Sequence, residues 1–160
     1  LYLKQYKQYG IDYTIFRLFN VYGYGQDMEN LNQGMVSIYL AQTLKSKTVE
    51  VKGSFDRYRD FVYVDDVVSA LVLGLESKTN GEIYNVATKR KTTVGELLDL
   101  IFKTHDNPDS FEAINIGQYD GDQDGNTGDN EKLKKLGWRP SVKLEDGIKK
   151  FYNEVRKNNE

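Results

Sequence analysis

FVYVDDVVSALVLGLESKTNGEIYNVA, residues 61–87, contains the strand–helix–strand pattern that decides the fold class. FVYV (61–64) and EIYNVA (82–87) are apolar and rich in β-branched and aromatic residues, so both segments are predicted strands. Between them Asp65 and Asp66 are candidate N-terminal caps of a helix. A strand, a helix and a second strand in this order are typical of an α/β protein.

The rest of the chain continues this alternation of predicted strands and helices. Thr93 and Glu96 fit a capping box, which marks the start of one of the helices. NVYGYGQ (20–26) is turn-like because of its closely spaced glycines. The further predicted strands span 14–19, 48–53 and 111–116, and the further predicted helices span 1–9, 34–46, 94–103, 129–136 and 144–155.

Composition indicates an ordinary globular protein. The 160 residues suffice for one domain with a hydrophobic core, and 39% of them are hydrophobic. A net charge of −2 gives no reason to expect nucleic acid or a membrane surface as a partner. Because cysteine is absent, disulfides and thiolate metal sites are excluded, and a cytoplasmic location is expected. The chain opens in helix-like sequence without a starting methionine, so a fragment of a longer protein is expected.

DGDQDGNTGDNE (120–131) matches every fixed position of the EF-hand calcium loop. An EF-hand needs a helix at both ends of the loop, but FEAINIGQY (111–119) has the alternation of a strand. Thr127 stands where EF-hands carry an aliphatic residue that bridges to a paired loop. We therefore expect an acidic surface turn and no metal site, and keep a non-enzymatic calcium- or nucleotide-binding module as an alternative.

Arg59 is a candidate phosphate-binding residue. It lies in RYRDFVYVDD at the entry to an apolar strand, where a guanidinium could bind a phosphate with two parallel hydrogen bonds. A salt bridge with Asp56 or Asp60 is an equal alternative. The single histidine, His105, follows a predicted helix and is expected to be a surface or helix-end residue without a catalytic role.

Five motifs, taken in order and spacing, resemble the C-terminal half of the extended short-chain dehydrogenase/reductase family. This family comprises NAD-dependent nucleotide-sugar epimerases and dehydratases, and the likeness is greatest to members of the UDP-glucose 4-epimerase type. The motifs are RLFNVYG (17–23), VKGSFDRYRDFVYVDDV (51–67), GEIYNVA (81–87), TTVGEL (92–97) and LGWRP (136–140).

The resemblance implies the last strands and helices of a Rossmann-type NAD-binding sheet, together with a small substrate-binding domain. Residues 1–23 would end the Rossmann domain, 24–160 would mainly bind the nucleotide sugar, and 61–87 would return to the sheet. The implied activity is 4-epimerisation of a UDP-hexose through a 4-keto intermediate, with 4,6-dehydratase or reductase activity as the alternative. The family's catalytic Ser/Thr and Tyr-x-x-x-Lys lie upstream of RLFNVYG, so this chain alone is expected to be inactive, and its parent is expected to be a homodimer.

The resemblance also assigns individual roles. Arg59 would pair with the pyrophosphate, Lys52 would replace an aromatic residue that stacks on uracil, and Asp122 would bind the ribose hydroxyls. A basic residue of the family is replaced at Gln118 and Tyr119. The implied cofactor contacts at the nicotinamide end of NAD are Phe19 and Val21; the other implied substrate contacts are Asn20, Val36 and Ser37, with Met35 beside them.

Overall fold

The computed structural model describes residues 2–30, 34–117 and 123–157. Its helices are α1 (Tyr2–Tyr6), α2 (Met35–Lys45), α3 (Val64–Leu73), α4 (Val94–Phe102), α5 (Glu131–Lys134) and α6 (Leu144–Lys157). Its strands are β1 (Ile15–Leu18), β2 (Asn20–Tyr22), β3 (Thr48–Val51), β4 (Tyr58–Arg59), β5 (Phe61–Tyr63), β6 (Ile83–Val86), β7 (Thr92–Thr93) and β8 (Glu112–Asn115).

Parallel strand pairs dominate the architecture. β1 pairs with β6, β2 with β5 and β3 with β8, all in parallel, while β4 and β7 form a short antiparallel pair. The chain changes its strand partner between β1 and β2. The Phe19 amide donates to Val86 O of β6 at 3.1 Å, and the Asn20 amide donates to the Asp60 carbonyl at 3.0 Å. The predicted α/β class is confirmed.

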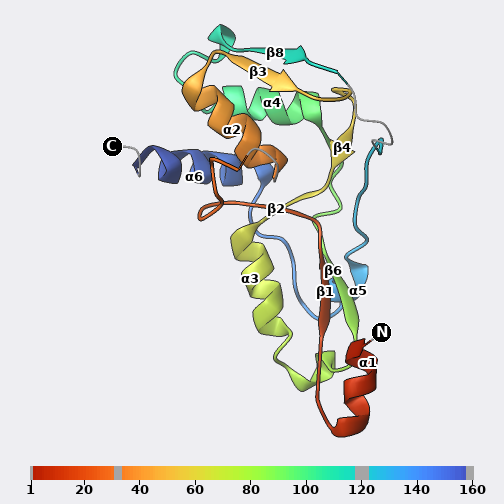
Figure 1. The fold of residues 1–160 in the computed structure, drawn as a ribbon. Helices are drawn as coiled ribbons and strands as arrows, with labels where there is room; N and C mark the ends of the chain where they lie inside the picture. Colours follow the sequence, from red (N-terminus) through yellow and green to blue (C-terminus); the bar gives the residue numbers. More distant parts are fainter. Residues whose placement is uncertain (1, 31–33, 118–122, 158–160) are drawn as a thin grey trace.

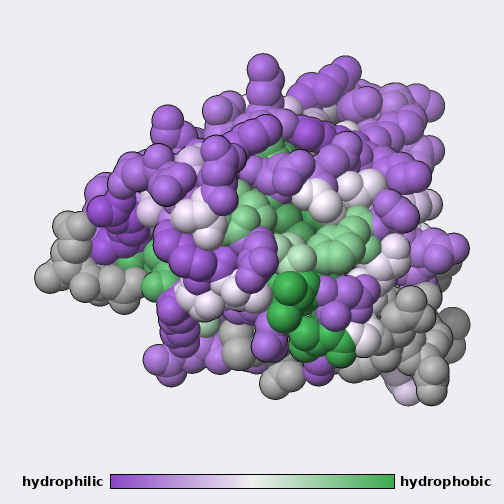
Figure 2. Space-filling view, turned by 90° about the horizontal axis from the view of Figure 1, so that it is seen from above, coloured by the Kyte–Doolittle hydropathy of each residue, from purple (hydrophilic) through white to green (hydrophobic). Residues whose placement is uncertain are grey.

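Among the residues that the structure describes, the buried apolar side chains form two clusters. The larger cluster joins α2, α4 and α6 to β3 and β5, in the upper part of Figure 1. The smaller one lies among α3, β5, β6 and α5, and includes Trp138. Viewed from above, the surface of the upper part is largely hydrophilic around a central hydrophobic area (Figure 2).

Two helices illustrate how local sequence produces these elements. Thr93 caps α4: its hydroxyl accepts from the Glu96 amide, and the Glu96 carboxylate accepts from the Thr93 amide, so the predicted capping box is confirmed. In α6, Ile148, Phe151 and Val155 are buried at helical spacing, while the intervening residues are mostly charged. The amphipathic pattern thus fixes the face that α6 turns to the core.

Two local predictions are wrong. Residues 20–22, expected in a turn, form β2, because their main chain pairs with β5 and this pairing outweighs the turn propensity of the glycines that follow. The expected aspartate cap of α3 is also absent, since its N-cap residue is Tyr63 without a side-chain hydrogen bond. Asp66 is instead buried, and its carboxylate accepts from the Ser141 amide at 2.9 Å, the Ser141 hydroxyl at 2.7 Å and the Val142 amide at 3.1 Å.

Helix α3 also carries apolar residues on its outer side. Val67 and Ala70 face the core, yet Val72 is 61% exposed and Leu75, just beyond the helix, is 86% exposed. Apolar residues around the whole circumference are typical of a helix that is covered on both sides. Within the described residues, no helix is both long and apolar enough to cross a membrane.

Candidate functional site

Arg59 ends the short strand β4, which lies between two other segments. On one side β4 pairs with β7, placing Arg59 opposite Thr92. On the other side the Tyr58 amide donates to the Asp124 carbonyl at 2.9 Å. The guanidinium of Arg59 is half-buried, and its Nη1 donates to Tyr58 O at 2.8 Å and to Gln123 O at 3.3 Å. The loop around residue 123 therefore helps to orient this arginine.

Asp60, the next residue, is fully buried and ties several segments together. Its Oδ1 accepts from the Thr88 amide at 2.8 Å and the Thr88 hydroxyl at 2.6 Å. Its Oδ2 accepts from the Lys89 amide at 2.9 Å and the Gly128 amide at 3.0 Å. From the sequence, an ion pair between Asp60 and Arg59 was one alternative. In the structure the Asp60 carboxylate accepts hydrogen bonds from these main-chain and hydroxyl donors.

The main chain of Asp60 brings Asn20 to the same place. The Asn20 amide nitrogen Nδ2 donates to the Asp60 carbonyl at 2.9 Å, so the two predicted substrate residues, Asn20 and Arg59, are linked through Asp60. Phe19 precedes Asn20 and is half-buried, with its ring against Gly128. Val21 packs against the smaller core cluster. These residues lie where the chain, between β1 and β2, changes its strand partner from β6 to β5. This point follows the carboxyl ends of the parallel strands β1 and β6, and the carboxyl ends of parallel strands are common ligand sites.

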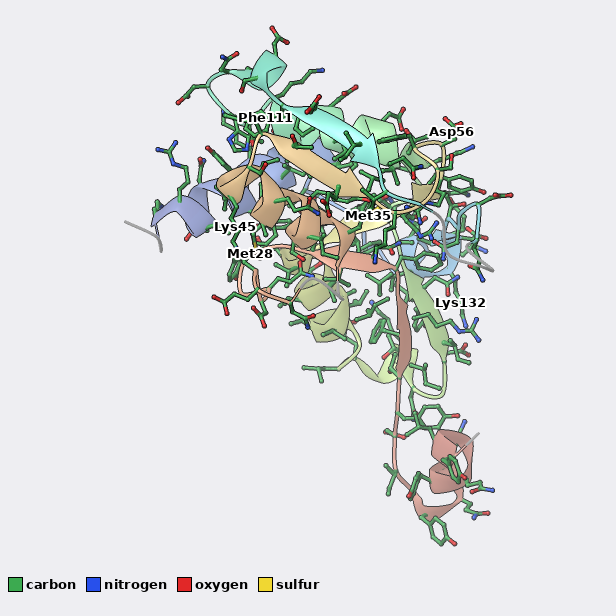
Figure 3. The ribbon with its side chains drawn as sticks, turned by 45° about the horizontal axis from the view of Figure 1, so that its top comes forward. Met28, Met35, Lys45, Asp56, Phe111 and Lys132 are labelled. Carbon is green, nitrogen blue, oxygen red and sulfur yellow. The ribbon has the colours of Figure 1, made fainter. Side chains whose placement is uncertain are left out.

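The predicted substrate residues at the start of α2, unlike Asn20 and Arg59, are almost completely buried. Val36 and Ser37 are each 1% exposed, and the Ser37 hydroxyl donates to Gly34 O at 2.8 Å. Figure 3 shows Met35 in the first turn of α2, near the middle of the molecule. A ligand contact at these buried positions would have to use the main-chain N–H groups of the helix N-terminus, which attract anions.

The turn between β3 and β4 contains basic residues, and a further lysine lies beside β4. The Lys52 side chain is exposed. The Arg57 guanidinium donates one hydrogen bond to the Lys52 carbonyl and another, of 3.1 Å, to the Ser54 carbonyl. Lys91 lies over the Tyr58 ring, with its Nζ 4.1 Å from the ring centroid. With Arg59 these residues place basic side chains in and beside β4, with the acidic Asp56 in the same turn. Basic side chains of this kind are suited to a phosphate-bearing ligand.

Residues 118–122 lie outside the described residues, and with them Gln118, Tyr119 and Asp122 of the acidic loop. Of the described part, Glu131 accepts from Lys134 at 3.0 Å and from Lys89 at 3.3 Å, and these contacts lower the pKa of its carboxyl. The segment that would enter an EF-hand is strand β8, as expected from its alternation. Among the described residues, no three acidic or histidine side chains are grouped as metal ligands.

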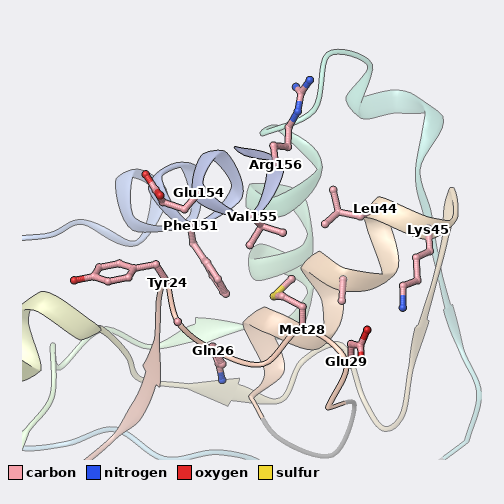
Figure 4. A pocket seen from close by; sticks show the side chains of 12 residues that line it. Tyr24, Gln26, Met28, Glu29, Leu44, Lys45, Phe151, Glu154, Val155 and Arg156 are labelled. Carbon is pink, nitrogen blue, oxygen red and sulfur yellow. The ribbon is translucent and has the colours of Figure 1, made fainter. Parts of the chain in front are cut away.

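A cavity of about 630 Å³ lies between residues 24–29, α2 and α6 (Figure 4). Met28, Leu44, Phe151 and Val155 give it apolar walls. None of the described site residues predicted from the sequence lines this cavity. The candidate site is therefore the polar junction around Asp60, where two of the predicted substrate residues, Asn20 and Arg59, come together.

The role of Asp60 in this junction was not predicted. Its position directly before the buried strand FVY was the available signal, because an aspartate at the end of a buried segment needs hydrogen-bond donors. The donors themselves, from residues 88, 89 and 128, are distant in sequence and became visible only in the fold.

Comparison with known proteins agrees with the resemblance seen in the motifs. The sequence model of the NAD dependent epimerase/dehydratase family matches residues 1–87. A putative UDP-glucose 4-epimerase of Methanocaldococcus jannaschii is 38% identical over 99% of this chain and 50% of its own length. A dTDP-4-dehydro-6-deoxyglucose reductase of Escherichia coli is 31% identical over 88% of this chain and 44% of its own length.

A solved structure has the same fold over nearly the whole chain. The UDP-glucose 4-epimerase of Thermotoga maritima, determined with UDP-glucose, superposes with a TM-score of 0.90 and 36% identity. The match covers 99% of this chain and 51% of that one. The chain thus spans about half the length of the relatives it matches. From the family match, the sequence identity and the shared fold, we conclude that this chain belongs to the NAD-dependent epimerase/dehydratase family.

Proposed function

We propose that the chain supplies the nucleotide-sugar-binding part of an NAD-dependent 4-epimerase of the UDP-hexose class, acting through a 4-keto sugar. The observation that carries the proposal is the junction at Arg59. The half-buried Arg59 ends β4, shortly before the parallel strand β5, with further basic residues beside it, in a chain 38% identical to a putative UDP-glucose 4-epimerase. A planar guanidinium binds a diphosphate with well-defined geometry.

Each proposed contact has its own physical basis. Arg59 binds the diphosphate, and Lys52 and Arg57 add positive charge to the same edge. Asn20 is held against the Asp60 carbonyl at the start of β2, beside the sugar-diphosphate position. Asp122 is proposed to accept hydrogen bonds from the ribose, while Val36 and Ser37 contribute only main-chain N–H groups. Anchoring the nucleotide end leaves the hexose free to present both faces.

The residues expected at the cofactor fit the nicotinamide end of NAD. Phe19 and Val21 are apolar and half-buried, and they flank the strand ends where the chain changes partner. Such side chains can cover an aromatic ring and exclude water from it. Bound NAD would supply the hydride-transfer chemistry, in which a hydride is removed from a sugar carbon and later returned to the sugar. The chain's own contribution is to hold the substrate in position for that exchange.

The proton transfer is proposed to use residues outside this chain. No tyrosine among the 160 residues is followed by a lysine four positions later, so the family's Tyr-x-x-x-Lys pair is not found in it. We therefore expect these residues alone to show no epimerase turnover. The protein at its full natural length is proposed to form a homodimer.

A second candidate is reductase or 4,6-dehydratase activity. The specific observation favouring it is the 31% identity to a dTDP-4-dehydro-6-deoxyglucose reductase. Product analysis separates the candidates: UDP-glucose converted to UDP-galactose supports the epimerase, whereas loss of water or oxidation of NADH by a 4-keto sugar supports the alternative.

The binding proposal is tested with Arg59→Ala in the full-length protein. Calorimetry should show UDP affinity falling at least about tenfold, because one charge-assisted contact contributes about 1.5–3 kcal/mol. Arg139→Ala is the matched control, since Arg139 Nη1 also bonds main-chain carbonyls, including Trp138 O at 2.9 Å, but in the segment between α5 and α6. Unchanged UDP affinity in Arg59→Ala would count against this site.

A further inference from the structure

Strand β4 is very short, so its position depends on its neighbours. It consists of Tyr58 and Arg59 alone, and a strand of this length has few ladder hydrogen bonds. One neighbour is the segment of residues 88–93, which ends in β7, and the other is the segment of residues 123–128. If either segment moved, the direction of the Arg59 guanidinium would change with it.

The carboxylate of Asp60 is bonded to both neighbouring segments at once. Oδ1 holds Thr88 through its amide and hydroxyl, while Oδ2 holds the Lys89 and Gly128 amides. The first two partners precede β7, and Gly128 ends the other segment. A single buried side chain, adjacent to Arg59 in sequence, therefore fixes the spacing of the segments on either side of it.

The backbone around these donors would not hold this arrangement by itself. Lys89 has a φ of 68°, in the left-handed region that a residue other than glycine enters at a cost of about 1 kcal/mol or more. At Gly128, an added Cβ would overlap Ala87 and Phe19. Both positions are therefore defined by contacts, and Asp60 supplies a hydrogen bond to each.

We propose that Asp60 is a positioning residue for diphosphate binding: its carboxylate holds the segments beside β4 so that Arg59 presents its guanidinium to the nucleotide. The inference rests on the proposed function, because the ligand is the diphosphate of that site. Asp60 itself is fully buried and has no contact with the ligand in this proposal.

Asp66 provides a matched control for a purely structural role. It too is a buried aspartate whose carboxylate accepts main-chain and hydroxyl hydrogen bonds, from Ser141 and Val142. These bonds connect α3 to the segment before α6, and neither Ser141 nor Val142 belongs to the segments beside β4. Asp60→Asn and Asp66→Asn therefore remove similar interactions, and both are expected to lower the melting temperature.

The experiment measures binding of UDP and of uridine to the full-length protein by calorimetry, for the wild type and both variants. Asp60→Asn should lower UDP affinity about tenfold, which is about 1.4 kcal/mol, and change uridine affinity less than about twofold. Asp66→Asn should leave both affinities within about twofold of the wild type. In an Arg59→Ala background, Asp60→Asn should have little further effect on UDP affinity, because the two residues act as a unit.

Thr88→Val keeps the test informative if Asp60→Asn does not fold. This variant removes only the hydroxyl donor to Oδ1, so a smaller loss of UDP affinity is expected, again without a loss for uridine. A wild type that does not bind UDP refutes the proposed function and this inference with it. Wild-type binding of UDP, with unchanged affinity in a folded Asp60→Asn or Thr88→Val variant, refutes the positioning role alone. Equal losses for UDP and uridine, or additivity with Arg59→Ala, also overturn it.

Discussion

Replacing Gly128 with alanine should destabilise the candidate site through steric overlap. A Cβ on Gly128 would lie 2.3 Å from the Ala87 Cβ and 2.6 Å from Phe19 Cε2. Carbon atoms in contact are ordinarily about 3.5–4.0 Å apart, so the neighbours would have to move by more than about 1 Å. Ala87 is fully buried and its Cβ is fixed to the main chain, so the backbone of one segment must shift.

The size of the effect follows from two contributions. Overpacking of a filled site costs about 1–3 kcal/mol. The shift also weakens the hydrogen bond from the Gly128 amide to Asp60, and a bond to a charged group contributes about 1.5–3 kcal/mol. Because the bond is strained and not wholly lost, we expect the free energy of unfolding to fall by about 2–4 kcal/mol.

Equilibrium urea denaturation, followed by circular dichroism, measures this change, with Gly95→Ala as the matched control. A Cβ on Gly95 meets its nearest neighbours at 3.9 Å, an ordinary contact, and Gly95 lies in α4. Alanine is favoured over glycine in a helix by about 0.5–1 kcal/mol, so this variant should be as stable as the wild type or more so. If Gly128→Ala lost less than about 0.5 kcal/mol, the steric reasoning would be refuted.

Two further predictions concern other parts of the fold. Burial, followed by the charge of Lys47, lowers the pKa of His105 below its ordinary value of 6.5, so its contribution to stability is present above about pH 6.5 and is lost as the pH falls through the folded-state pKa. Thermal melts from pH 8 to pH 5 should therefore show a decline that is smaller in His105→Gln; equal declines would exclude His105 as the cause. Thr93→Ala should lower the free energy of unfolding by about 1 kcal/mol in urea titrations, because it removes the cap of α4, and an unchanged value would show that the cap is dispensable.

The sequence predicted the long elements well because their signals are local. The apolar faces of α2, α4 and α6 and the capping box of Thr93 each depend on residues within a few positions of one another. Strands β4 and β7 were not predicted, since each has only two residues and exists through its pairing with the other. The turn expected at residues 20–22 was wrong for a related reason: its backbone partners, residues 61–63, are far away in the sequence.

In the candidate site too, the residues with a local sequence signal could be predicted, and those that depend on contacts between distant segments could not. Arg59 was singled out by its place before an apolar strand, and its contact role stays a prediction. The network around Asp60 could not be predicted, because Thr88 and Gly128 come close to it only when β6 and the loop before α5 are packed. For Val36 and Ser37 the resemblance to the family implied a position against a ligand, but it contained no information on their burial.

The outer side of α3 has a practical consequence for experiments on these 160 residues by themselves. Val68, Leu71, Val72 and Leu75 are between 45% and 86% exposed on one helix and its end. Contiguous apolar surface of this kind promotes self-association of a chain that is purified by itself. Light scattering at the concentrations used for calorimetry should therefore accompany any titration of the 160 residues alone. A heat of dissociating aggregates could otherwise be taken for a heat of nucleotide binding.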